Sequence, residues 1–144
     1  MRLYLDTSAL VKLYVDEEGS PVVRSAVDQA RLIATSAMAY VEARAAFVRR
    51  RYEKRLSADE YRRIVRDLDA DWGHYLVVVV TDRLIQDSAN LAERHRLRAY
   101  DAVHVASAAA VHSQLAEPVI FASWDVSLEK AATREGLEPL RLER

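Results

Sequence analysis

The segment RLYLDTSAL, residues 2–10, places a carboxylate directly after a run that is typical of a buried strand. Residues 2–5 predict the strand, and TSALVKLY, from residue 7, predicts a helix that begins at once. Aspartate is disfavoured in strands and costly in apolar surroundings, so Asp6 needs either a hydrogen-bonding role or a cation. The rest of the chain distinguishes these two roles.

Short β-rich runs and longer helical patterns alternate through the chain. Further strands are expected at residues 32–35, 76–80 and 119–122, with a short last one in 138–142. Start and stop signals predict helices over residues 20–30, 36–55, 57–72, 81–95, 101–115 and 126–136. This alternation predicts an α/β domain, a three-layer α/β/α arrangement around a central, mainly parallel sheet of four or five strands.

The long helix expected after Ser36 carries apolar residues at helical spacing, at positions 38, 41, 45 and 48. Ser36 is its expected N-cap, and Ser57 with Glu60 forms an expected capping box for the next helix. Gly136 is the expected stop of the last helix.

Composition bounds the kind of protein. The chain has 144 residues, 51% of them hydrophobic, which fits one globular domain spanning residues 1–144. It has no cysteine, which excludes disulfides and thiolate zinc sites and leaves oxygen and nitrogen as metal ligands. We find neither a signal peptide nor an apolar run near the roughly 18 residues of a membrane helix, so a soluble, cytoplasmic protein without membrane contact is expected.

Arginines cluster although the net charge is only −1, from 21 basic and 22 acidic side chains. One group lies in RRRYEKR (49–55) and another in RHRLR (94–98). Each run alone is more typical of a solvated helix face, but together they are compatible with phosphate binding. The candidates are Arg49, Arg50, Arg51, Arg96 and Arg98.

Three aspartates lie near strand ends or helix starts. Asp6 follows residues 2–5, Asp125 lies three residues beyond the strand at 119–122, and Asp101 opens an Ala-rich helix. Ligands of open parallel sheets bind beyond the carboxyl ends of the strands, so at least two of these acids belong to that edge. Aspartate is also a favoured N-cap, and capping is an equal alternative for each one alone.

Glu42 favours a cluster of acids. It lies inside the long helix, too far from Ser36 to cap it, at the margin of an apolar face. Alone it would be expected to reach water or an arginine. Beside three aspartates it indicates a group of carboxylates that cations must neutralise, and such oxygen ligands favour Mg²⁺ or Mn²⁺.

Four segments together resemble the acidic motifs of PIN-domain nucleases, specifically the VapC-type toxins of bacterial toxin–antitoxin pairs. They are LYLDTSALVKLY, the Glu of TSAMAYVEARAAF, AYDAVHVASA and FASWDVSL. They occur in the family's order and cover nearly the whole chain. The resemblance implies that Asp6 and Asp101 are the principal metal ligands, Glu42 a ligand directly or through water, and Asp125 a further ligand or an organiser of the site.

Hydroxyl groups flank these acids. Thr7 and Ser8 match the family's polar pair after the first strand, although starting the helix is an equally good role for them. Ser123 stands where the family more often has Thr, so the hydroxyl is kept while Asp125 becomes the least secure of the four acids.

The implied reaction is hydrolysis of RNA phosphodiester bonds assisted by one or two Mg²⁺ or Mn²⁺ ions, leaving a 5′-phosphate and a 3′-hydroxyl. The arginines named above would hold the RNA backbone. The resemblance also implies a VapB-type antitoxin that blocks the acidic pocket with a basic side chain, and a homodimer.

The main alternative is a catalytically silent PIN-like module that binds RNA or protein. A dehalogenase-type phosphatase is excluded because Ser8 stands where that family needs a second aspartate. His104, one helical turn after Asp101, could face the pocket, but packing at a helix–sheet boundary is the preferred interpretation. Trp124 is expected to pack near the site without acting in it.

Overall fold

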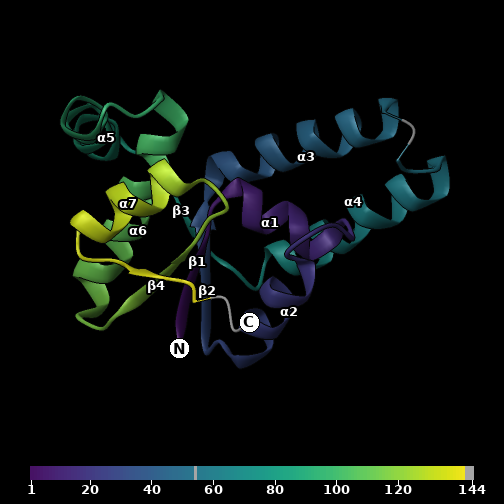
Figure 1. The fold of residues 1–144 in the computed structure, drawn as a ribbon, viewed down its shortest axis with the longest axis horizontal. Coiled ribbons are helices and arrows are strands. Elements are labelled where there is room, and N and C mark those ends of the chain that lie inside the picture. Colours follow the sequence, from purple (N-terminus) through teal and green to yellow (C-terminus); the bar gives the residue numbers. More distant parts are fainter. Residues whose placement is uncertain (54, 142–144) are drawn as a thin grey trace.

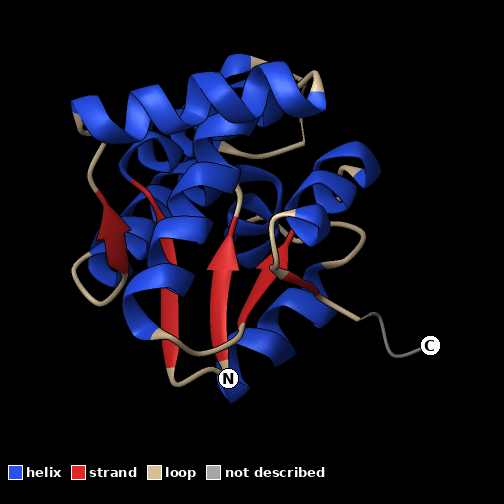
Figure 2. Cartoon of the chain, turned by 90° about the vertical axis from the view of Figure 1, so that its left-hand side faces the viewer, coloured by secondary structure: helices blue, strands red, loops and turns tan. Residues whose placement is uncertain are grey.

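The computed structural model describes residues 1–53 and 55–141, which form a parallel sheet between two layers of helices. The sheet has five strands in the order β3-β2-β1-β4-β5, and all neighbouring pairs are parallel. Figure 2 shows the larger strands pointing the same way. The strands are β1 (Arg2–Leu5), β2 (Leu32–Ser36), β3 (Leu76–Val78), β4 (Val119–Ala122) and β5 (Glu138–Pro139).

Helices cover both faces of the sheet (Figure 1), which confirms the predicted three-layer α/β/α class. One layer contains α1 (Thr7–Tyr14), α2 (Ser20–Gln29), α3 (Ala37–Tyr52) and α4 (Ala58–Trp72). The other contains α5 (Asp82–His95), α6 (Ala99–Leu115) and α7 (Val126–Arg134). No helix within the described ranges is both long and apolar enough to span a bilayer.

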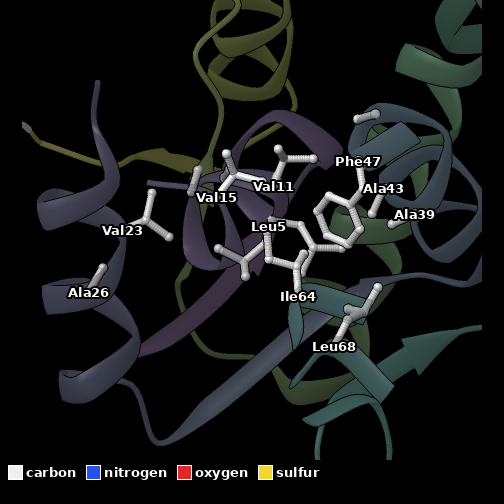
Figure 3. Packing of buried hydrophobic residues seen from close by; sticks show 14 of the residues in the cluster. Leu5, Val11, Val15, Val23, Ala26, Ala39, Ala43, Phe47, Ile64 and Leu68 are labelled. Atoms are coloured by element: carbon white, nitrogen blue, oxygen red, sulfur yellow. The ribbon is translucent and has the colours of Figure 1, made fainter. Parts of the chain in front are cut away.

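The central strand β1 supplies both cores because its side chains alternate between the two faces. Leu3 and Leu5 pack with the layer of α1 to α4, and Figure 3 shows Leu5 beside Phe47 and Ile64 of that layer. Tyr4 points the other way and packs with α5, α6 and α7. A strand buried on both faces has the near-continuous apolar sequence that parallel sheets require.

The order of the strands reverses between β1 and β4. The chain moves from β1 outward through β2 to β3, and then from β4 outward to β5 on the other side. Loops at such a switch point leave the sheet in opposite directions and open a crevice at the carboxyl ends of the strands. Asp6 follows β1 directly and its backbone N–H donates to the carbonyl of Ala122 at the end of β4 (3.1 Å).

The apolar spacing in α3 indicated the wrong buried face. Val41 is 70% exposed and Ala45 is also exposed. The buried residues of this helix are Ala39, Ala43, Ala46 and Phe47. Small alanines let α3 approach its neighbours closely, and Phe47 packs into the core on the same face.

Several element bounds also differ from expectation. β3 ends at Val78, not residue 80, because its partner β2 ends at Ser36, opposite Val78. α6 begins at Ala99, so Asp101 lies in its first turn and does not open it. The expected last strand shortens to β5, and its residue 142 lies outside the described residues. The expected helix over 36–55 ends at Tyr52.

The N-caps predicted for α3 and α4 are confirmed. The Ser36 hydroxyl accepts from the N–H of Met38, and Ser57 with Glu60 forms the reciprocal capping box. α7 ends at Arg134, two residues before Gly136, whose φ of 89° lies in the left-handed region that glycine tolerates.

Candidate active site

A cleft of about 570 Å³ opens at the switch point and is lined by all four predicted acids. Asp6 ends β1, Glu42 lies in α3, Asp101 in the first turn of α6, and Asp125 immediately before α7. Segments far apart in the sequence thus place their carboxylates around one cavity.

Asp6 caps α1 and is also buried at the cleft. Its Oδ1 accepts from the N–H of Ala9 (2.9 Å) and from the hydroxyl of Ser8 (2.6 Å). The residue is only 4% exposed, and burial raises the pKa of the Asp6 carboxyl although His104 and the neighbouring donors oppose that rise. Within the described part of the chain no Lys, Arg or His lies within ion-pair distance of it. Asp6 therefore has the hydrogen-bonding role and, when ionised, still needs a cation.

Asp125 and Asp101 differ in their local roles. Asp125 caps α7, because its Oδ1 accepts from the N–H groups of Ser127 (2.9 Å) and Leu128 (3.2 Å). Asp101 caps nothing: the N-cap of α6 is Arg98, without a side-chain cap bond. Helix capping thus accounts for the presence of Asp125. It does not account for Asp101, which is 9% exposed and makes no capping bond at the start of α6.

The guanidinium of Arg98 lies between these two aspartates. Its Nε donates to Asp101 Oδ2 (3.1 Å), and its Nη2 is 3.8 Å from Asp125 Oδ2. The Arg98 side chain is 67% exposed, so the ion pairs are screened by solvent and the arginine is free to leave.

Glu42 is held by donors on two other elements. Its Oε1 accepts from the hydroxyl of Thr7 (2.8 Å) and lies 3.0 Å from Nε2 of His104. Burial opposes ionisation of Glu42, but the hydrogen bonds from His104 and from the Thr7 hydroxyl outweigh it and lower the pKa of this carboxyl. Glu42 is therefore ionised and aimed at the cleft at neutral pH.

His104 packs at the boundary of helix and sheet, as expected, and also belongs to the site. It is 2% exposed, and its Nδ1 lies 2.8 Å from the hydroxyl of Tyr4 on β1. From the sequence, packing at a helix–sheet boundary and a place in the pocket were treated as alternative roles for His104. The spacing of three residues from Asp101, which puts both side chains on one face of α6, was the signal that could have joined them.

The Ser8 hydroxyl ties the end of β1 to the loop after β4, and the Ser123 hydroxyl makes a local bond within that loop. Ser8 donates to Asp6 and accepts from the backbone N–H of Trp124 (3.1 Å). Ser123 accepts from the N–H of Asp125 (3.0 Å). These bonds fix the backbone between the two acids, and Trp124 packs beside the cleft with its ring under the ammonium of Lys12 (5.2 Å).

The predicted basic residues divide into two groups. Arg49, Arg50 and Arg98 line the cleft. Arg51 lies instead over the ring of Tyr61 (5.7 Å), and Arg96 ends α5 in a left-handed conformation. The first group is therefore placed to meet a ligand in the cleft, and the second is not.

Sequence reasoning missed two charged residues of the cleft, Lys12 and Glu17. Glu17 accepts from Lys12 Nζ (3.1 Å) and from Nη2 of Arg50 (3.1 Å). The acid thereby positions two cations of the cleft lining. The signal for Lys12 was its spacing of four residues from Ser8, which puts both on one face of α1, but no pattern in the sequence indicated Glu17.

The comparison with known families agrees with this arrangement. The family model described as PIN domain matches residues 3–117. The chain belongs to the PIN-domain family. The matched segment contains Asp6, Glu42 and Asp101 and ends before Asp125, the acid that the sequence left least secure.

Two curated relatives of this PIN domain are ribonucleases VapC45 and VapC49 of Mycobacterium tuberculosis. Each is 35% identical over 135 residues, which cover 93% of this chain and 91% of the relative. This similarity confirms the resemblance to VapC-type proteins that the four motifs indicated.

Solved structures share the fold of this PIN domain. FitAcB of Neisseria gonorrhoeae superposes with a TM-score of 0.66 at 16% identity, covering 96% of each chain. PAE2754 of Pyrobaculum aerophilum gives 0.64 at 19% identity, covering 97% of this chain and 90% of that chain. VapBC-1 of nontypeable Haemophilus influenzae gives 0.62 at 15%, covering 96% of each. At such identities these likenesses support the α/β fold.

The acids of this PIN domain fit a hard divalent ion by their chemistry. The ligands are oxygen atoms, and the buried Asp6 has no described basic partner. Among the described residues, however, no group of three or more His, Asp or Glu side chains is arranged to hold one ion. Withdrawal of Arg98 would free oxygens of Asp101 and Asp125 for a cation.

Proposed function

We propose that this PIN domain is a metal-dependent endoribonuclease, the toxin of a toxin–antitoxin pair, which hydrolyses RNA phosphodiester bonds. The observation that carries the proposal is the convergence of four acids from separate elements on one cleft. The identity of 35% to the two mycobacterial ribonucleases supports the choice of RNA as substrate.

The acids would hold one or two Mg²⁺ or Mn²⁺ ions. Asp6 and Asp101 are the principal ligands, Glu42 binds directly or through a water, and Asp125 is a further ligand or keeps the start of α7 in place. A bound ion supplies an acidified water and positive charge beside the phosphate.

The protein's own cations would bind the RNA backbone. Arg49 and Lys12 line the cleft, and Arg98 lies at its acidic end. When Arg98 leaves Asp101, its guanidinium can pair with a phosphate, to which its planar donors are suited. Such contacts position RNA without reading its sequence.

The partner would be a VapB-type antitoxin with a basic side chain that enters the acidic pocket. Arg98 shows that a guanidinium fits between Asp101 and Asp125. The homodimer implied by the family resemblance stays a prediction, which light scattering of the purified chain measures.

The test is cleavage of total cellular RNA by the antitoxin-free protein with Mg²⁺, with Mn²⁺ and with chelator. Asp6→Asn is the inactive variant, and its folding is checked by circular dichroism. Asp28→Asn is the matched control, because Asp28 is exposed on α2, away from the residues that line the cleft. Metal-dependent, site-selective cleavage by the wild type and the control, lost in Asp6→Asn, is expected.

A binding module is the second candidate, favoured by the capping roles of Asp6 and Asp125. No cleavage by folded wild type with either metal, across RNA from several sources, would favour that candidate. Loss of RNA binding in Asp6→Asn would point the same way.

A further inference from the structure

A buried chain of hydrogen bonds runs from the central strand to the cleft. It starts at the hydroxyl of Tyr4 on β1, passes through the ring of His104 on α6, and ends at Oε1 of Glu42 on α3. The Tyr4 ring is fully buried and stacked on Phe121 of β4, with centroids 5.5 Å apart and planes at 5°. This series of hydrogen bonds is therefore anchored in the buried core.

The partners determine which ring nitrogen of neutral His104 carries the proton. The Glu42 carboxylate only accepts hydrogen bonds, so the Nε2 that lies 3.0 Å from it must be the N–H. Nδ1 is then the acceptor and requires a donor, which the Tyr4 hydroxyl supplies at 2.8 Å. Burial raises the pKa of Tyr4, so its hydroxyl keeps the proton that it donates.

The same contacts direct Glu42. Thr7 donates to Oε1 and lies 3.0 Å from His104 Nε2, so both donors meet the same carboxylate oxygen. No hydrogen bond to Oε2 is formed within the described part of the chain, which leaves that oxygen for the cleft. Glu42 is only partly buried, and without these donors its long side chain would turn freely in the solvent.

We propose that His104 is a positioning residue whose Nε2–H aims Glu42 at the cation site, with Tyr4 fixing the required tautomer. Residues that orient a metal ligand in this way typically change metal affinity or activity by about 10- to 100-fold when they are lost. The inference rests on the proposed metal-dependent function, but its central element is a hydrogen-bond geometry that exists without RNA.

Two substitutions of His104 separate positioning from packing. In His104→Gln the side-chain amide reaches the place of Nε2 and still donates to Glu42. In His104→Asn the shorter amide reaches only the place of Nδ1, so Tyr4 keeps a partner while Glu42 loses the His104 donor and keeps only Thr7. The matched control is His112→Gln, the same change on the same helix, where the ring bonds to the carbonyl of Glu117.

The probe is Mn²⁺ binding to the antitoxin-free protein, measured by titration calorimetry. We expect His104→Gln and His112→Gln to bind within about threefold of the wild type and His104→Asn to bind about 10- to 100-fold more weakly. Equal weakening by both His104 variants, or none by either, would overturn the inference, as would a wild type that binds no Mn²⁺. Melting temperatures identify a variant that fails to fold.

The tautomer is tested by a second measurement that needs neither metal nor RNA. Nitrogen-15 NMR of wild-type His104 is expected to show the proton on Nε2, and Tyr4→Phe, which keeps the ring stack on Phe121, is expected to reduce that population. A proton on Nδ1 in the wild type would refute the inference. Cleavage assays in parallel separate the two proposals: Mn²⁺ binding without RNA cleavage would contradict the proposed ribonuclease and leave the role of His104 standing.

Discussion

Replacing Gly19 by alanine is expected to destabilise the protein through a residue beside the cleft. Gly19 caps α2 with φ of 91°, a left-handed conformation that costs other residues about 1–2 kcal/mol. A Cβ at this position would also lie 2.6 Å from Cζ2 and 2.7 Å from Cε2 of the Trp124 ring. Relieving such overlap costs about 1–3 kcal/mol. The expected loss of unfolding free energy is therefore about 2–5 kcal/mol.

Urea unfolding followed by far-UV circular dichroism measures this loss. For a chain of this size each kcal/mol corresponds to about 4 °C, so the melting temperature should fall by roughly 8–20 °C. In a Trp124→Leu background the overlap disappears, and Gly19→Ala should cost only the backbone term, about 1–2 kcal/mol. Cleavage should also weaken, because the N–H of Trp124 holds Ser8, which in turn holds Asp6.

Gly73→Ala is the control for this experiment. Gly73 has an ordinary helical φ of −67°, and an added Cβ meets nothing within 4 Å. Alanine should there stabilise by about 0.4–1 kcal/mol. If Gly19→Ala costs the same with and without the Trp124 ring, or less than about 0.5 kcal/mol, the close approach to that ring does not explain the glycine.

Three further outcomes follow from the charged groups. Asp6→Asn should raise the free energy of unfolding in metal-free buffer at neutral pH. The pKa of the Asp6 carboxyl is raised in the folded state, so the charged carboxylate destabilises the fold above that pKa and this penalty vanishes in acid. Asparagine caps the helix equally well. Arg98→Gln should leave stability nearly unchanged because the side chain is exposed, yet weaken RNA binding and reduce its salt dependence by about one counterion. Burial opposes ionisation of Glu135, but its bonds to His95 and Arg94 lower the pKa of this carboxyl. Ionised Glu135 therefore stabilises the fold above its unfolded pKa, and this stabilisation is lost as the pH falls through the folded pKa. Glu135→Gln should then cost about 0.5–1 kcal/mol at pH 7 and nothing in acid, as urea titrations at both pH values would show.

The sequence predicted most of the sheet because polar residues that cap the following helices mark the ends of strands. Asp6 and Ser36 stop their strands and cap the following helices, and both signals lie within a few residues. The end of β3 could not be predicted this way, because it depends on where β2, its only described neighbour, stops. The buried face of α3 also depends on its neighbours, since Ala43 is selected by their proximity and Val41 is left exposed.

The site was predictable as a set of acids and unpredictable as a network. Topology alone brings the residues after β1 and β4 together. Glu42 was indicated by its place inside a helix, too far from Ser36 to cap it. Key partners of those acids come from distant segments: His104 reaches Glu42, and Arg98 reaches Asp125. No local pattern contains such contacts, because they arise only when the helices have docked on the sheet.

The double role of Asp6 has a genetic consequence. Because asparagine can replace its capping bonds to α1, a single-base change in the Asp6 codon should give a folded chain that lacks the charge in the cleft. Such an allele would still be made and would present nearly the same surface to any protein that recognises the active form. In a population of cells, the simplest inactivating mutation would thus produce a folded, inactive chain that competes with the active form for that protein.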